Sequence, residues 1–166
     1  MFAALSLVYE CYAKRGLVAP NKLRLRLRRG IELTQRLTMF GAFDQGALVA
    51  TLGVIADGEG GLPAERLLVD AKTVDSCAEF TNLAGSRLTA ILPLFEAVDE
   101  WCRMHGVTTA YAQVSPSDVR LYGRIGFLPL GDPIDVGDDR VQVMAITRER
   151  RDIALQRRAG SGGQTR

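Results

Sequence analysis

The chain has 166 residues, of which 47% are hydrophobic and 24% are charged, and its formal net charge is +2. This length and composition predict one globular domain, and the small charge argues against a polyanionic partner such as nucleic acid. The three cysteines are far apart in the sequence, which argues against a disulfide framework, and the single histidine argues against a histidine-rich zinc site. No apolar run approaches the roughly 20 residues that span a bilayer.

The first half of the chain predicts a helix followed by strands. Apolar residues at helical spacing predict a helix over residues 2–15. Strand patterns follow at residues 23–28, 37–43, 48–55 and 78–84. The turn signal at 44–46 makes a hairpin of the middle two strands, and Pro63 begins a short helix that reaches Leu68.

The second half contains the clearest helix. Its apolar stripe consists of Ile91, Leu94, Phe95, Val98, Trp101 and Cys102. Thr89 is the expected N-cap, Pro93 is expected in the first turn, where proline is tolerated, and Gly106 ends the helix. After it, strands are predicted at residues 108–114, 126–128 and 141–146, with a short helix at residues 119–124 between the first two.

Helices and strands in this order predict a single mixed α/β domain over residues 1–147. Residues 148–166 are rich in arginine and end in glycine and serine, so we expect a basic, disordered tail. The N-terminus lacks the basic start of a signal peptide, which makes the cytoplasm the expected location. The first predicted helix is short for the family considered below, which leaves a longer native N-terminus open.

Residues 121–127 carry a first resemblance. Leu121-Tyr122, followed after three residues by Gly126-Phe127, resembles the LY-x-x-x-GF segment of the GCN5-related N-acetyltransferase (GNAT) superfamily. Many members have asparagine where this chain has Ser115. The resemblance implies a central mixed sheet that splays apart between two parallel strands and is flanked by helices.

A narrower resemblance covers the middle of the chain, which is similar to the N-acyl amino acid synthases, relatives of the acyl-homoserine lactone synthases. The matching segments are 39–42, 49–54, Asp57 with 61–63, 78–79 and 83–84, and Tyr12 with 20–21 nearer the N-terminus. The chain departs from the synthase pattern at Phe80, Thr81 and Asn82. The resemblance implies transfer of a long acyl chain from acyl carrier protein to the amine of an amino acid.

Glu79 and Tyr122 are the candidate catalytic residues. Glu79 is a solitary carboxylate in an otherwise apolar strand, which points to a general base or a group that binds the acceptor amine. The alternatives for Glu79 are a salt bridge to an arginine of a neighbouring strand and an edge position that faces solvent. By the resemblance, Tyr122 is the acid that protonates the thiolate leaving group, and the alternative is a core aromatic.

The resemblance also implies a donor site. It places the main-chain N–H that stabilises the oxyanion near Leu83 and Ala84, opposite the segment from Ala112 to Val114, where pantetheine amides bind like an added strand. Arg87 is the candidate phosphate ligand, with a solvated surface arginine as the alternative. Residues 83–90 contain one glycine and lack the usual pyrophosphate loop. An acyl carrier protein, which presents a single phosphodiester, therefore suits this chain better than coenzyme A.

The basic residues 22–29 are a candidate docking site for an acidic carrier protein, through electrostatic steering. The alternative is a strand face exposed to solvent. We expect no bound cofactor, with the acyl thioester serving as co-substrate. Two other functions remain open: an N-acetyltransferase that uses acetyl-CoA, and a non-catalytic module that keeps this fold to bind a ligand. Nucleic-acid binding is the weakest alternative, because no aromatic residues interleave with the arginines.

Overall fold

The computed structural model describes residues 2–19, 22, 35–68, 76–85, 88–137 and 139–153. The elements in chain order are α1 (Phe2–Lys14), β1 (Leu37–Asp44), β2 (Ala47–Ala56), the 3-10 turn η2 (Glu65–Leu67), β3 (Cys77–Gly85), α2 (Leu88–Met104), β4 (Thr109–Val114), η3 (Pro116–Asp118), α3 (Val119–Arg124), β5 (Leu128–Pro129), β6 (Ile134–Val136) and β7 (Asp139–Thr147). The predicted basic strand at 23–28 lies outside the described residues.

The strands form a mixed sheet in the order β1-β2-β3-β4-β7-β5, and β6 pairs with β7 off this path. The pairs β1–β2, β4–β7, β5–β7 and β6–β7 are antiparallel. β3 and β4 are parallel, and α2 is the crossover between them. A parallel pair needs such a long connection, whereas the antiparallel neighbours β1 and β2 need only a turn.

The chain divides into two compact units, and β3 contributes to both. The first unit comprises Met1–Ala56 and Phe80–Trp101, and the second comprises Asp57–Glu79 and Cys102–Arg166.

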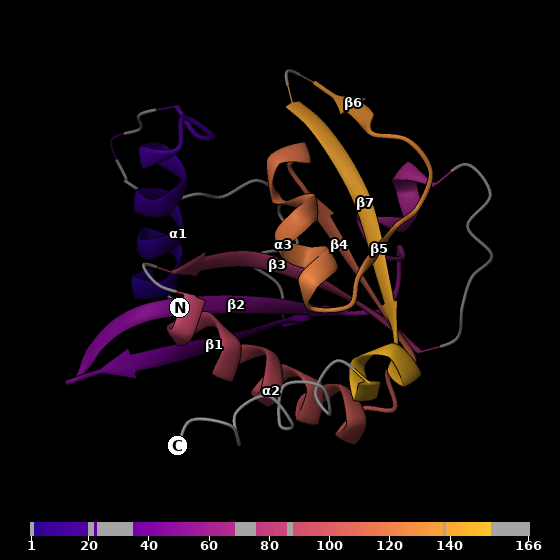
Figure 1. Cartoon of the computed structure of the whole chain (residues 1–166), viewed down its shortest axis with the longest axis horizontal. Helices are drawn as coiled ribbons and strands as arrows, with labels where there is room; N and C mark the ends of the chain where they lie inside the picture. Colours follow the sequence, from indigo (N-terminus) through magenta and orange to yellow (C-terminus); the bar gives the residue numbers. More distant parts are fainter. Residues whose placement is uncertain are drawn as a thin grey trace, which may run out of the picture. The chain divides into compact units, whose positions relative to one another are not determined.

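The first unit contains α1, the β1–β2 hairpin, most of β3 and most of α2. The predicted hairpin is confirmed (Figure 1), and Gln45 and Gly46 both have positive φ, at 48° and 81°, as a tight two-residue turn requires. Helix α1 packs against β2 through an apolar face that includes the buried Leu5 and Val8. Gly85 ends β3 at a crowded point, because a Cβ there would lie 2.9 Å from atoms of Ala50 and Ile91.

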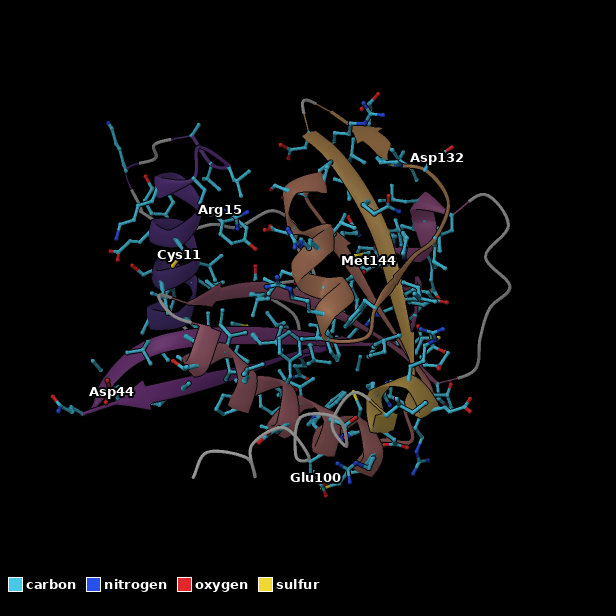
Figure 2. The ribbon with its side chains drawn as sticks, in the orientation of Figure 1. Cys11, Arg15, Asp44, Glu100, Asp132 and Met144 are labelled. Carbon is cyan, nitrogen blue, oxygen red and sulfur yellow. The ribbon has the colours of Figure 1, made fainter. Side chains whose placement is uncertain are left out.

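The second unit is built around β4 and β7, with α3 packed beside β5 and β7 (Figure 1). Met144, labelled on β7 in Figure 2, is fully buried, as is Val143. β6 was not expected from the sequence, since its three residues Ile134–Val136 are too few to show an alternating pattern.

The long helix differs in one respect from the prediction. α2 begins at Leu88, so Thr89 lies inside the helix and is not its N-cap, and Pro93 lies beyond the first turn. Proline has no N–H to donate to the carbonyl four residues earlier, which here belongs to Thr89. The apolar stripe explains why the helix nonetheless continues, because Ile91, Leu94 and Val98 are all buried.

Ordered structure extends past the predicted end of the domain at residue 147. Residues 148–153 are helical, and the buried Arg151 donates a 2.8 Å hydrogen bond to the carbonyl of Val107. Residues 154–166 of the predicted tail lie outside the described residues. In the parts of the chain that the structure describes, no helix is both long and apolar enough to cross a membrane.

Candidate functional site

Glu79 is a buried carboxylate that accepts hydrogen bonds from Ala64 and Gln113. Its side chain lies on β3 and is 1% exposed, so the solvent-facing edge position considered above is wrong. Oε2 accepts a 2.7 Å hydrogen bond from the backbone N–H of Ala64, and Oε1 accepts a 3.0 Å hydrogen bond from the side-chain amide of Gln113. Both of these donors are neutral amide groups.

Hydrogen bonds within residues 58–65 orient the Ala64 N–H toward Glu79. Glu65 Oε2 accepts a 2.9 Å hydrogen bond from the N–H of Leu62, and the side chains of Leu62 and Ala64 are fully buried. The N–H of Gly61 also donates to the carbonyl of Gly58 at 2.9 Å. Glu79 thus fastens the segment before η2 to the sheet, and that segment in turn fixes the orientation of the carboxylate.

Tyr111 on β4 completes a polar row beside Glu79. Tyr111 and Gln113 are two residues apart and so lie on one face of β4, as Cys77 and Glu79 do on β3. Burial raises the pKa of Tyr111 to about 12, and the nearby Cys77 and Glu65 add to the shift, with a side-chain hydrogen bond between Tyr111 and Cys77. The phenol therefore stays protonated through the physiological range.

Tyr111 and Gln113 were not among the site residues expected from the sequence. A signal was present, because both strands place two polar or ionisable residues two apart in an apolar run. The structure pairs them in one register: Cys77 with Tyr111, and Glu79 with Gln113.

Tyr122 lies in the core of the second unit. Its side chain is 6% exposed, and its ring meets that of Phe127 edge-on, with centroids 5.3 Å apart. The backbone N–H groups of Ile125 and Phe127 both donate to the carbonyl of Tyr122, which closes the end of α3. Ser115, where relatives often have asparagine, contacts the hydroxyl of Ser117 at 2.7 Å and donates to Asp118 at 3.1 Å.

The candidate donor residues Leu83 and Ala84 lie on β3 in the first unit and are buried. Asn82, just before them, has φ of +52°, a left-handed conformation inside a strand. The hydroxyl of Tyr12 on α1 donates a 3.1 Å hydrogen bond to the carbonyl of Leu83. Val114 is buried at the end of β4 in the second unit.

Arg87, the candidate phosphate ligand, lies outside the described residues, as do residues 23–29 of the basic segment. Within the described residues, no group of three or more histidine, cysteine, aspartate or glutamate side chains is placed to hold a metal ion. The candidate residues that the structure describes make contacts in three groups. Glu79 contacts Ala64 and Gln113, Tyr122 contacts Phe127, and Leu83 contacts Tyr12.

Comparison with known proteins places these residues in context. The family model described as N-acyl amino acid synthase FeeM matches residues 3–147. No curated protein sequence matches the chain.

Solved structures show the same fold at low identity. FeeM, an N-acyl amino acid synthase from uncultured soil microbes, is 20% identical with a TM-score of 0.73, over 89% of this chain and 84% of that chain. TofI, solved with an inhibitor and MTA, is 16% identical with a TM-score of 0.71, over 93% and 88%. BjaI, a CoA-dependent acyl-homoserine lactone synthase solved with SAM and isopentyl-CoA, is 15% identical with a TM-score of 0.68, over 93% and 80%. The predicted GNAT-like fold is confirmed.

Proposed function

Because the chain belongs to the FeeM family of N-acyl amino acid synthases, which are N-acyltransferases, we propose that it transfers a long acyl chain from acyl carrier protein to the amine of an amino acid. The observation that carries the proposal is the family match, which extends over residues 3–147 and so includes every candidate site residue. The carrier-protein donor is favoured by the single glycine in residues 83–90, since coenzyme A would present a pyrophosphate to this segment.

The proposed reaction is a direct transfer. The acceptor amine loses a proton to a base, and its nitrogen attacks the thioester carbonyl to form a tetrahedral oxyanion. The C–S bond then breaks, the amide is released, and the thiolate takes a proton from an acid. Such a reaction needs a base, an oxyanion donor and an acid, but no covalent enzyme intermediate.

We assign the base, or the binding of the acceptor amine, to Glu79. The hydrogen bonds from the Ala64 N–H and the Gln113 side-chain amide hold the carboxylate in one orientation. A fixed carboxylate among buried side chains interacts more strongly with an ammonium group than an exposed one does. Tyr122 is assigned as the acid, with its packing against Phe127 fixing the ring.

The donor site is assigned to backbone groups of Leu83, Ala84 and Val114, at the predicted splay between β3 and β4, with Arg87 on the phosphate. The left-handed conformation of Asn82 supports this assignment, because an interruption of the regular pleat is a common way to turn strand peptide groups toward a ligand. The basic residues 22–29 are assigned to docking of the carrier protein.

The test is a mass-spectrometric screen of the purified protein with a mixture of amino acids and one of three donors: long-chain acyl carrier protein, the matching acyl-CoA, or acetyl-CoA. We expect an N-acyl amino acid with the carrier-protein donor. Product with acyl-CoA alone would overturn the donor assignment, and product with acetyl-CoA alone would indicate an N-acetyltransferase. No product with any donor, together with retained binding of the acyl carrier protein, would indicate a non-catalytic module.

A further inference from the structure

Tyr12 reaches from α1 to the backbone of β3. The half-buried tyrosine donates its hydroxyl proton to the carbonyl oxygen of Leu83, 3.1 Å away and 71 residues later in the sequence. The position of the tyrosine is fixed by the helix, because the buried Leu5, the buried Val8 and Tyr12 follow one another at spacings of three and four residues, which is one helix face. The contact therefore belongs to the docked position of α1 and not to a mobile side chain.

The carbonyl that Tyr12 holds shares a peptide unit with a proposed catalytic group. The C=O of Leu83 and the N–H of Ala84 belong to one planar peptide, so an anchor on the oxygen also sets the direction of the N–H. A donor on the oxygen further polarises the peptide and strengthens its N–H as a hydrogen-bond donor. Tyr12 thus acts at one end of the group whose other end faces the reaction in the proposed mechanism.

This peptide lies where the strand is least regular. Asn82 has φ of +52° and is 2% exposed, so a buried left-handed residue directly precedes Leu83. A left-handed residue in a strand turns the peptides that follow it away from the direction that a regular pleat would give them. An anchor from outside the sheet is a physical means of holding a peptide in that position.

We propose that Tyr12 is a positioning residue for acyl transfer: its hydroxyl orients and polarises the Leu83–Ala84 peptide so that the Ala84 N–H stabilises the oxyanion. The inference rests on the proposed function for its catalytic consequence, but the hydrogen bond itself does not. The two parts are therefore tested by separate measurements.

The hydrogen bond is tested by NMR with paired labels. Leu83-Ala84 is the single Leu-Ala step in the 166-residue sequence, so protein carrying carbonyl-¹³C leucine and ¹⁵N alanine gives one doubly labelled peptide. In Tyr12→Phe we expect the carbonyl carbon and the amide proton of this peptide to move upfield, because both lose polarisation. Tyr9→Phe removes a hydroxyl one turn earlier on the same helix and should leave the signal in place.

The catalytic consequence is tested by steady-state kinetics of the same two variants. Removal of a direct oxyanion donor costs about 10²–10³ in rate, and the loss of a group that only positions the donor should cost less. We expect Tyr12→Phe to lower kcat about tenfold. The KM for the acyl donor should change by less than about twofold, because ground-state binding is retained. Tyr9→Phe should keep both constants.

An unmoved NMR signal in Tyr12→Phe would overturn the inference at its first step. A moved signal with unchanged kcat would overturn the catalytic role. A loss of melting temperature in Tyr12→Phe that is matched by Tyr9→Phe, with equal losses of kcat, would show that both tyrosines act only through helix docking. If the wild-type protein turns over no donor, the proposed function fails, while the NMR signal still decides whether Tyr12 holds the peptide.

Discussion

Glu79 and Gln113 face each other across two strands that run in the same direction, with the amide of Gln113 donating to Glu79 Oε1 at 3.0 Å. The other oxygen of Glu79 accepts from the Ala64 N–H at 2.7 Å, so one buried carboxylate connects β3, β4 and the segment before η2. The same geometry serves stability and, in the proposed mechanism, orients a base. Substitutions that keep the hydrogen bonds but remove the charge separate these two contributions.

Glu79→Gln should remove activity while sparing the fold. The new amide oxygen can accept from the Ala64 N–H, and its NH₂ group can donate to the side-chain oxygen of Gln113 once that amide turns over. We expect a loss of about 10²–10⁴ in kcat, as for removal of a general base, with a small change in melting temperature. Activity close to that of the wild type would show that Glu79 is structural only.

Glu79→Ala is the matched variant for stability. It removes the acceptor of the buried Ala64 N–H and of the half-buried Gln113 amide, and an unsatisfied buried group costs about 1–3 kcal/mol. Thermal and urea unfolding should therefore show a much larger loss of stability than in Glu79→Gln. Equal losses in the two variants would mean that the charge of Glu79, and not its hydrogen bonds, fastens the segment before η2.

Gln113→Leu tests the other partner. The leucine has a similar volume to the half-buried glutamine but cannot donate to Glu79 Oε1, so a charge-assisted hydrogen bond is lost. We expect a loss of about 1–3 kcal/mol in the free energy of unfolding, measured with urea. An unchanged free energy of unfolding would mean that other groups replace Gln113 as donors to Glu79 Oε1. The Glu79–Gln113 hydrogen bond would then not be important for the fold.

Tyr111 should be visible in an alkaline titration. The chain has four tyrosines, and burial, reinforced by Cys77 and Glu65, raises the pKa of Tyr111 to about 12. The folded pKa lies above the unfolded value of about 10, so the corresponding stability is present below pH 10 and is lost as the pH rises toward 12. Absorbance at 295 nm should show a late component that Tyr111→Phe removes. Loss of a component that titrates below pH 10 would contradict the shift.

The fold was predictable from sequence to the extent that its elements carry local patterns. The β1–β2 hairpin follows from two strand-like segments joined by the turn signal at 44–46, and α2 follows from its apolar stripe. The start of α2 at Leu88 was not predictable, because Pro93 suggested a later beginning and tertiary packing of Ile91 and Leu94 outweighs that signal. β6 is too short to carry a period of its own.

The site was predictable only where one residue stands out from its neighbours. Glu79 does so as a carboxylate in an apolar strand, yet one of its partners is a backbone N–H, and its pairing with Gln113 depends on the register of two strands that are far apart in the sequence. The contact of Tyr12 with Leu83 joins residues 71 positions apart through a backbone oxygen, which has no side-chain signature at all. Long-range contacts to main-chain groups depend on the fold and not on the residue at the far end.

Gly85 offers a test of how tightly the end of β3 is held. A Cβ at this position would lie 2.9 Å from the Cβ of Ala50 and 2.9 Å from Cγ1 of Ile91, and neither atom is the far end of a flexible chain. Gly85→Ala should therefore destabilise the protein by about 1–3 kcal/mol through overpacking. It should also lower the turnover of acyl donor, because β3 must shift next to Leu83 and Ala84.

Gly123→Ala is the control for Gly85→Ala. Gly123 lies inside α3, and a Cβ added there would have no atom within 4 Å, so the methyl group meets open space. Alanine in a helix is favoured over glycine by up to about 1 kcal/mol, and this variant should be as stable as the wild type or more so. Urea unfolding of the two variants side by side measures the difference. If the two variants have equal free energies of unfolding, β2 and α2 can shift to accommodate the added methyl group with little loss of stability. The end of β3 would then be loosely packed.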